Sequence, residues 1–317
     1  MLNFYKTPIQ KLSENLNNNS FFIKRDDLLP ISFGGNKARK AVLFFEDIER
    51  VSADCVVTYG SSSSNHCRVI SNIAAAKGIP CYIISPTESF FPTSNSKLVE
   101  LFGAKVSYCS VSEISATIDQ KLKDLVEQGF YPYFIQGGGH GNIGTKAYVI
   151  GYEEIIEFEK ENGIFFDYIF HTSGTGTTQA GLICGKLLHG DNRKIIGISN
   201  ARKNPYGSQV VLDSVNSYLK SLDMASVTSD DIHFVDDYIL EGYGSYNGQI
   251  LKTIKDVLKY DGIPMDTTYT GKAFWGMKEF IKKHEISNCN ILFIHTGGTP
   301  LFFDKMEELK ELSIYKE

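Results

Sequence analysis

Residues 168–188 read YIFHTSGTGTTQAGLICGKLL, which is a short apolar run, a turn rich in glycine and hydroxyl residues, and a helical stretch. The run Tyr168–His171 is apolar almost throughout and does not alternate with polar residues, which is typical of a parallel strand buried on both faces. The helical stretch Ala180–Leu188 begins as the turn ends. Strand, turn and helix in this order predict one unit of an α/β protein.

The same order recurs on both sides of this stretch. Helical stretches such as Val69–Lys77 separate most of the strand-like runs, so we expect an α/β fold with a largely parallel sheet. The further runs that we predict as strands are Phe21–Ile23, Cys55–Tyr59, Cys81–Ile84, Ala104–Tyr108, Tyr133–Ile135, Lys194–Ile198 and Ile291–Ile294.

The length and charge of the chain exclude several kinds of protein. With 317 residues the chain is long enough for two domains. It carries 32 Lys and Arg against 37 Asp and Glu, a formal net charge of −5, so no basic field favours nucleic acid or an anionic membrane as a partner. We find no signal peptide and no apolar stretch of membrane-spanning length, and therefore expect a cytoplasmic protein.

The six cysteines do not have the spacing of metal ligands. None of them forms a Cys-x-x-Cys pair, so neither a zinc site nor a dithiol redox motif is predicted, and we expect no metal. Without a secretion signal, they are expected to be reduced thiols in the core.

Lys37 lies in the stretch Gly34–Lys40, which reads GGNKARK and opens an apolar helical face. A cation is disfavoured at a helix N-terminus, where the dipole is positive. The same field would lower the pKa of Lys37 and favour the neutral amine that a Schiff-base lysine needs. The alternative is a surface lysine in a turn.

The turn Thr172–Gly181 is a candidate phosphate-binding site. Glycines let backbone N–H groups approach an anion, the helix N-terminus adds partial positive charge, and the hydroxyls add donors. The turn is not a P-loop, since no Gly-Lys-Ser/Thr follows, and Gly174 and Gly176 lack the third glycine of the dinucleotide fingerprint. The alternative is a helix start capped by Ser or Thr.

A second loop, Gly60–Arg68, reads GSSSSNHCR and also follows a strand. Loops at the carboxyl ends of parallel strands are where α/β proteins place ligands. The hydroxyls and Asn65 could bind a carboxylate or a ring oxygen, unless the loop is only a solvated turn. It holds no Gly-x-Ser-x-Gly elbow, so a serine hydrolase is not supported.

The loop Gly137–Gly144 contains a Gly-x-Gly-x-x-Gly pattern, which favours a rival interpretation, a nicotinamide dinucleotide site. That site needs an acidic residue at the end of the following strand, to hold the ribose. The strand ends in His171 and Thr172, and its only acid, Asp167, lies at the other end. The nicotinamide interpretation therefore lacks the acidic residue that would hold the ribose.

Five segments, in this order along the chain, resemble one family, the pyridoxal-phosphate enzymes of the D-cysteine desulfhydrase and 1-aminocyclopropane-1-carboxylate deaminase group. The resemblance extends from Thr7 to about Phe303, nearly the whole chain. The segments are the Lys37 stretch, the Ser-Asn-His loop, the Thr/Gly turn, Tyr269–Lys272 (YTGK) and His295–Gly298 (HTGG). The last two segments carry no assigned role without the family.

The resemblance implies a fold-type II arrangement, with two open, twisted α/β domains and largely parallel sheets. The larger domain would hold the cofactor and comprise residues 1–47 and 156–317, and residues 48–155 would form a smaller inserted domain. Such enzymes are commonly homodimers, so we expect a homodimer that acts on a small amino acid.

The resemblance also implies the roles of individual residues. Lys37 would form a Schiff base with pyridoxal 5'-phosphate and, together with Ser64 and Tyr269, would carry out catalysis. The expected phosphate-binding residues are Gly174, Thr175, Gly176, Thr177 and Thr178, with help from Lys40; the other expected cofactor contacts are Asn65, Thr270 and Thr296; the expected substrate contacts are Ser64, Asn65, His66 and Tyr269.

Thr270 and Thr296 indicate the substrate. Family deaminases that open the cyclopropane ring carry Glu and Leu at these positions, whereas this chain matches the desulfhydrase-like pattern. A carboxylate near the pyridine nitrogen would make the cofactor a stronger electron sink, and loss of a thiolate needs less carbanion stabilisation than ring opening. We therefore predict a lyase that converts D-cysteine to pyruvate, ammonia and sulfide by β-elimination.

Other functions stay open. Ser63 stands where the family usually has a glutamine, and the loop Gly139–Asn142 differs from the family's usual one. These departures keep a 1-aminocyclopropane-1-carboxylate deaminase and a β-replacement enzyme, or another amino-acid lyase, as alternatives. From a different class, a non-catalytic pyridoxal-phosphate carrier is the alternative, although lysine, phosphate turn and tyrosine are all present.

Overall fold

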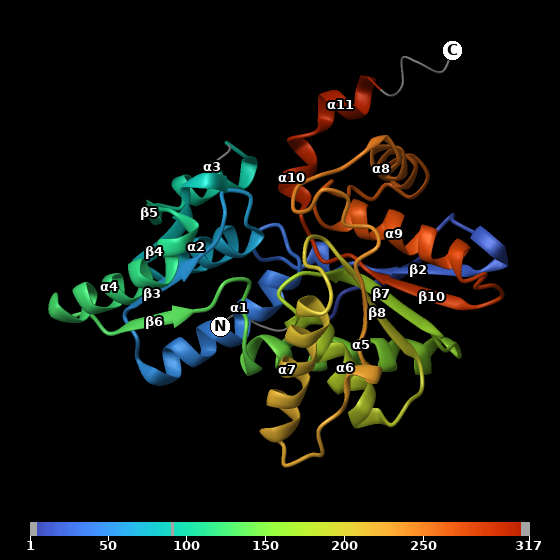
Figure 1. Cartoon of the computed structure of the whole chain (residues 1–317), viewed down its shortest axis with the longest axis horizontal. Coiled ribbons are helices and arrows are strands. Elements are labelled where there is room, and N and C mark those ends of the chain that lie inside the picture. The colour runs from blue at the N-terminus through green and yellow to red at the C-terminus, as the bar shows by residue number, and fades with distance from the viewer. Residues whose placement is uncertain (1–4, 90–91, 312–317) are drawn as a thin grey trace.

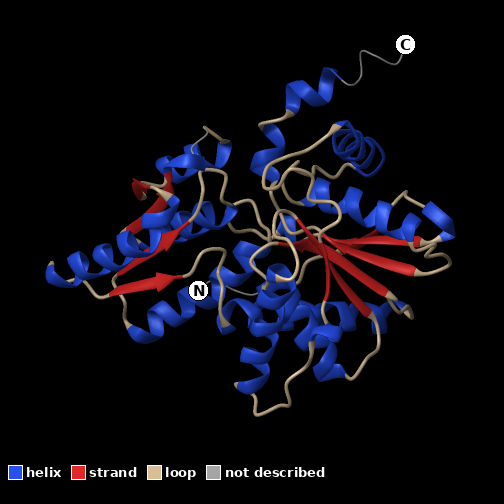
Figure 2. Cartoon of the chain, viewed as in Figure 1, coloured by secondary structure: helices blue, strands red, loops and turns tan. Residues whose placement is uncertain are grey.

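The computed structural model describes residues 5–89 and 92–311 and contains two β-sheets, each with helices packed on both faces. Figure 1 shows the smaller sheet on the left and the larger one on the right, and Figure 2 shows the same two groups of strands in red. The α/β class predicted from the sequence is confirmed, and the sheets are mostly parallel.

The larger sheet has six strands in the order β1-β2-β10-β7-β8-β9. β1 pairs antiparallel with β2 at one edge, and every other pair is parallel. The strands are β1 (Ile9–Lys11), β2 (Ser20–Lys24), β7 (Tyr168–Ser173), β8 (Lys194–Ser199), β9 (His233–Val235) and β10 (Asn290–Ile294).

The smaller sheet has four parallel strands in the order β5-β4-β3-β6. They are β3 (Cys55–Tyr59), β4 (Cys81–Pro86), β5 (Lys105–Cys109) and β6 (Pro132–Ile135). Every strand that the apolar runs predicted is present, with ends that shift by two residues at most. The sequence did not predict β1 and β9, because three-residue edge strands are too short to carry an apolar pattern.

Helices cover both faces of each sheet. In the larger sheet one face packs on α5, α6 and α7 and the other on α8 and α9; in the smaller sheet α1 and α2 lie opposite α4. No helix in the described part of the chain is long and apolar enough to cross a membrane. The helices are α1 (Asn36–Val51), α2 (Asn65–Lys77), α3 (Ser94–Leu101), α4 (Ile114–Glu127), α5 (Asn142–Asn162), α6 (Thr177–His189), α7 (Tyr206–Lys220), α8 (Gly248–Asp261), α9 (Thr270–Lys283), α10 (Thr299–Phe303) and α11 (Met306–Glu311).

The two-sided burial explains why the strand sequences are apolar without alternation. On β7, Ile169 packs among α5 and α6 while its neighbour Phe170 packs among α8 and α9. On β3, Val56 faces α1 and α2 while Val57 faces α4. Because successive side chains of a strand point to opposite faces, both faces must be apolar when both are covered.

A buried set of ion pairs joins β2, α1 and α5. Arg39 donates to Asp26 (2.9 Å) and to Glu154 (2.5 Å), and Lys24 pairs with the same two carboxylates. Burial alone would raise the pKa of Asp26, but Arg39 and Lys24 outweigh it and hold that pKa well below its usual range. Arg39 lies two residues after Lys37 on α1, so these ion pairs fix the start of α1 against the larger sheet.

The predicted domain limits both fall within helices. The limit between residues 47 and 48 lies inside α1, and the limit between residues 155 and 156 lies inside α5. The division of the chain into a larger and a smaller inserted domain stays a prediction.

Packing between α5 and α6 leaves no room for a side chain at Gly181. A Cβ there would lie 2.3 Å from the carbonyl oxygen of Thr145 and 2.5 Å from Cβ of Tyr148. We expect Gly181→Ala to lower the free energy of unfolding by about 1–3 kcal/mol, because one helix must move. Denaturant titration followed by circular dichroism measures this change.

Gly248 of α8 is the matched control, because a Cβ there meets nothing within 4 Å. Gly248→Ala should leave the stability unchanged or raise it by up to about 1 kcal/mol. Equal stability of the Gly181→Ala protein and the wild type would contradict the close packing of the two helices.

Candidate active site

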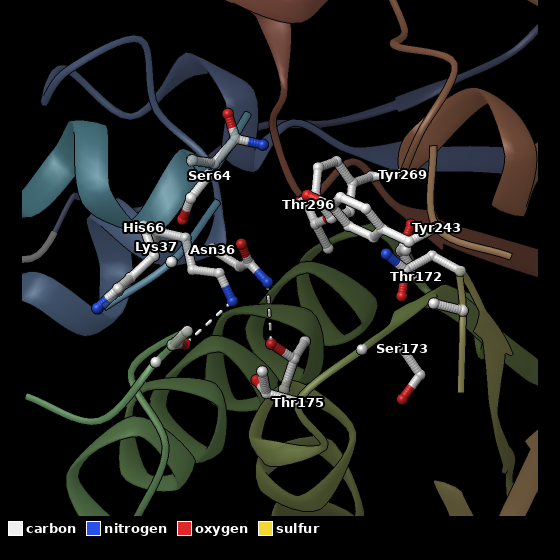
Figure 3. A pocket seen from close by; sticks show the side chains of 18 of the residues that line it. Asn36, Lys37, Ser64, His66, Thr172, Ser173, Thr175, Tyr243, Tyr269 and Thr296 are labelled. Carbon is white, nitrogen blue, oxygen red and sulfur yellow. Dashed lines mark hydrogen bonds between the residues drawn. The ribbon is translucent and has the colours of Figure 1, made fainter. Parts of the chain in front are cut away.

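A cavity of about 320 Å³ lies where the carboxyl ends of strands from both sheets meet (Figure 3). Its lining comes from the loops after β3, β6, β7, β8 and β10, from the start of α1, and from two tyrosines near α9. The predicted site residues that line it are Lys37, Ser64, Asn65, His66, Gly174, Thr175, Gly176, Thr178, Tyr269 and Thr296.

The start of α1 places Lys37 in the cavity. Gly35 precedes the helix with a φ of 96°, and a Cβ there would lie 2.6 Å from the carbonyl oxygen of Thr296, so glycine is required. The N–H of Asn36 donates to the same oxygen (3.0 Å), which ties the helix to the end of β10. Lys37 Nζ donates to the carbonyl oxygen of Gly138 (3.0 Å), which is its hydrogen-bond partner within the described chain.

The pKa of Lys37 is lowered to about 8, first by burial and then by the positive charge of Arg202. The direction agrees with the expectation from the sequence. The causes differ, because the sequence argument relied on the helix N-terminus alone. A lysine amine with this pKa is partly neutral near pH 8, and the neutral amine is the nucleophile.

The turn after β7, called the cup below, has the geometry expected of an anion-binding site. Gly174, Thr175 and Gly176 connect β7 to α6, and Gly176 has a φ of 95°, which favours glycine. The N-terminus of the 13-residue helix α6 opens into the cavity here. Thr178 Oγ1 accepts a hydrogen bond from Asn36 Nδ2 (3.1 Å), which links the cup to the Lys37 segment.

Lys40 and Thr177 lie behind the cup and not on the cavity lining. Lys40 Nζ donates to Thr177 Oγ1 (2.6 Å), and both side chains are buried. Burial and the neighbouring Lys37 lower the pKa of Lys40. Lys40 therefore supports the cup through Thr177 and does not project into the open space.

The loop before α2 presents polar groups from the opposite side. Ser64 caps α2, with its Oγ accepting from the N–H of Cys67 (3.2 Å). Asn65 Oδ1 accepts from Arg68 (2.8 Å) and Asn95 (2.9 Å), so its amide nitrogen is the group left to donate to a ligand.

His66 is neutral in this setting. Its Nε2 lies 2.8 Å from Thr58 Oγ1, and Thr58 gives its own proton to the carbonyl oxygen of Ile135 (2.7 Å). His66 therefore donates through Nε2. Burial, then Lys37 and Lys40, lower its pKa well below the usual range.

Asp266 positions Tyr269 at the start of α9. Its carboxylate accepts from the backbone N–H groups of Thr268 (2.9 Å), Tyr269 (2.8 Å) and Thr270 (3.0 Å). Thr270 Oγ1 also donates to Asp266 (2.9 Å). Tyr269 thus faces the cavity, whereas Thr270, which we expected beside the cofactor ring, is absent from the lining and turned toward Asp266.

Tyr243 is a site residue that the sequence did not indicate. Its hydroxyl lies 2.5 Å from the hydroxyl of Tyr269 and 3.1 Å from Ser63 Oγ, so it bridges the two sides of the cavity. It belongs to a Gly-Tyr-Gly stretch that follows no long strand, which gave it no signal. Burial and Tyr243 raise the pKa of Tyr269 well above its usual range.

Asn200 and Arg202 were also missed. They follow β8, as the cup follows β7, but their stretch contains no glycine-rich pattern. Only their place at the carboxyl end of a predicted strand could have indicated them.

The two departures from the family pattern, at Ser63 and His140, lie close to the cavity. Ser63 contacts Tyr243, and His140 Nδ1 donates to the carbonyl oxygen of Thr175 (3.1 Å).

The lining of the cavity contains no Asp or Glu within the described residues, while Lys37 and Arg202 supply positive charge. Two buried polar atoms on the lining, Thr172 Oγ1 and Arg202 Nη1, have no hydrogen-bond partner in that part of the chain. Such atoms are costly unless a ligand satisfies them. The arrangement fits a polar, anionic ligand beside a nucleophilic amine.

Three comparisons with known proteins identify the family and the fold to which the chain is similar. A family model described as pyridoxal-phosphate dependent enzyme matches residues 1–297. The chain is 31% identical to a D-cysteine desulfhydrase of Salmonella typhi over 308 residues, which is 94% of this chain and 93% of that protein. It superposes on the crystal structure of an ACC deaminase homologue with a TM-score of 0.89, at 29% identity and with 98% and 95% of the two chains covered.

More distant structures share the fold alone. One is a threonine deaminase isoform of Solanum lycopersicum, with a TM-score of 0.65 and 21% identity over 98% of this chain and 88% of that one.

The lowered pKa makes Lys37 reactive at a pH where exposed lysines are not. The neutral fraction of an amine rises with pH and reaches one half at its pKa, so Lys37 should reach half of its full reactivity near pH 8 and not near pH 10.5, which is the ordinary pKa of a lysine. Reductive methylation with formaldehyde at several pH values, read by peptide mass spectrometry, measures this. Lys203, exposed and near the same cavity, is the internal control, and the same pH midpoint for both lysines would contradict the prediction.

Proposed function

The chain belongs to the family of pyridoxal-phosphate-dependent enzymes, and on that basis we propose that it is a lyase that eliminates the β-substituent of a small amino acid, with D-cysteine as substrate. The overall reaction would convert D-cysteine and water to pyruvate, ammonia and hydrogen sulfide. The observation that carries this proposal is the meeting of Lys37, Ser64 and Tyr269 around one acid-free cavity, next to the anion-binding cup.

The residues present fit the cofactor. Lys37 offers an amine with a pKa of about 8, and the cup offers a helix N-terminus and glycines where a Cβ would narrow the space. The orphaned Thr172 Oγ1 offers a buried hydroxyl to a polar ring substituent or ring nitrogen. We propose that Lys37 holds the cofactor as a Schiff base, with Gly174–Thr178 around the phosphate and Lys40 behind Thr177.

When bound, the cofactor would supply an electron sink for the electron pair left on Cα of the amino acid. We assign the removal of the α-proton to the amine of Lys37. Ser64 is the less favoured base, because its Oγ accepts from Cys67 and no basic group beside it is recorded in the described structure. Ser64, Asn65 and His66 would then hold the substrate, with the helix N-terminus of α2 facing its carboxylate.

Tyr269 suits the role of proton donor to the leaving group. Its raised pKa keeps the hydroxyl protonated, and its bond to Tyr243 holds it in the cavity. Transfer of that proton to the departing thiolate would release hydrogen sulfide, and the proton taken by Lys37 would return the enzyme to its starting state through Tyr269 or water.

The position of Thr270 changes the argument about the substrate. Thr270 is turned toward the buried carboxylate of Asp266, so its contrast with the Glu of the family deaminases no longer supports the choice of substrate. Thr296 does line the cavity and is small and polar. The support for D-cysteine therefore comes from the relative at 31% identity and from Thr296.

A 1-aminocyclopropane-1-carboxylate deaminase is the second candidate, supported by the TM-score of 0.89 with the ACC deaminase homologue. A location in the cytoplasm and assembly as a homodimer are further proposals, which rest on the sequence and on the family resemblance.

The substrate assignment is tested by pyruvate release from the cofactor-loaded protein. We expect turnover of D-cysteine to exceed that of L-cysteine at least tenfold, with little keto acid formed from 1-aminocyclopropane-1-carboxylate. A keto acid formed chiefly from the cyclopropane compound would replace the proposal by the deaminase. No turnover of any of the three would move the search to other amino acids.

The role of Lys37 is tested separately from the substrate. Borohydride reduction should attach the cofactor to the Lys37 peptide of the wild type, and Lys37→Ala should abolish this covalent label. Lys203→Ala, which changes an exposed lysine nearby, should leave the label in place. Full labelling of the Lys37→Ala protein at another lysine would overturn the Schiff-base assignment.

A further inference from the structure

Arg202 stands out because part of its guanidinium is sealed from solvent without a partner. It follows β8 and lines the cavity, and its Nη1 is a buried atom with no hydrogen-bond partner in the described chain. Arg202 also forms no ion pair with any of the described residues. A buried charged donor without an acceptor is costly, so an acceptor is expected to come from outside the chain.

The one recorded contact of the guanidinium does not supply that acceptor. Its central carbon lies 5.2 Å from the ring centroid of Tyr206, which is a cation–π contact with a mostly exposed ring. Such a contact covers a face of the guanidinium and satisfies none of its N–H donors. Stacking on Tyr206 therefore orients Arg202 and leaves Nη1 unpaired.

The described residues around Arg202 provide no acidic partner on the cavity side. Asn200, two residues earlier, adjoins the cup, since its Oδ1 lies 3.1 Å from where a Cβ of Gly174 would be. The positive charge of Arg202 lowers the pKa of Lys37 and also acts on His140, which places it close to both. The described lining of the cavity holds no Asp or Glu that could pair with the guanidinium.

We propose that Arg202 binds an anionic group that a ligand brings into the cavity. Two groups share this chemistry, the phosphate of the cofactor and the carboxylate of the amino acid, and the planar fork of arginine matches both. This inference depends on the enzyme family and not on D-cysteine as the substrate, so it can stand or fall independently of the proposed function.

The test compares Arg202→Gln with Lys203→Gln, which removes the same charge from an exposed neighbour outside the lining. Full-length protein freed of cofactor is titrated with pyridoxal phosphate and with pyridoxal, which lacks the phosphate. If Arg202 binds the phosphate, Arg202→Gln weakens the binding of pyridoxal phosphate about tenfold or more and leaves pyridoxal unchanged. Arg202→Lys should recover part of the loss.

The second arm uses the loaded protein with aminooxyacetate and with O-methylhydroxylamine, which lacks the carboxylate. In both, the aminooxy nitrogen forms an oxime with the cofactor and the amine of Lys37 is released, which changes the cofactor's absorbance. If Arg202 binds a substrate carboxylate, Arg202→Gln slows the reaction with aminooxyacetate about tenfold or more and leaves O-methylhydroxylamine unaffected.

The proposal is overturned if Arg202→Gln and Lys203→Gln behave alike with all four compounds. It is also overturned if Arg202→Gln weakens the anionic and the neutral member of each pair equally, because that result would show a general loosening of the cavity. The melting temperature of each variant, measured with and without cofactor, identifies such a loosening.

Discussion

The buried ion pairs among Lys24, Asp26, Arg39 and Glu154 are the interaction on which the site depends. They join a strand of the larger sheet to α5 and to α1, and α1 packs its other face on the smaller sheet. Lys37 is the second residue of α1, so its place between the sheets is set by where this helix begins. Removing one member would leave a charged partner buried without compensation, which is far costlier than losing a surface pair.

The fold could be predicted because its central strands are apolar, which a single sequence shows directly. Strands covered on both faces must be apolar at every position, and β3, β4, β7, β8 and β10 each show such a run. The short edge strands lack such an apolar run. β1 and β9 are so short, and so polar at one end, that their sequences cannot be distinguished from those of loops. Limits between domains lack a local signal altogether, since a continuous helix such as α5 gives no change in composition where they would fall.

Within the site, the sequence indicated residues that belong to glycine-rich turns or to family motifs, and it missed Tyr243, Asn200 and Arg202, which belong to no such motif. Gly35 and Gly176 have positive φ angles that favour glycine, and the cup directly follows β7, so the place of the cup in space could be inferred. Tyr243 and Arg202 lie in irregular stretches, and only the tertiary structure brings them to the cavity. Thr270 does not share the direction of its neighbour Tyr269, because α9 begins at Thr270, and its contact with the cofactor stays a prediction.

The charge of the cavity contrasts with that of the whole molecule. The chain has a formal net charge of −5, yet the described lining of the cavity holds a lysine, an arginine and no acid. An anion approaching from solution is repelled by the molecule at large and attracted only close to the opening, so its diffusion is steered to one place. The screening length of physiological salt is about 8 Å, comparable with the reach of such a local field. Ionic strength should therefore control how fast the empty protein captures its anionic ligands.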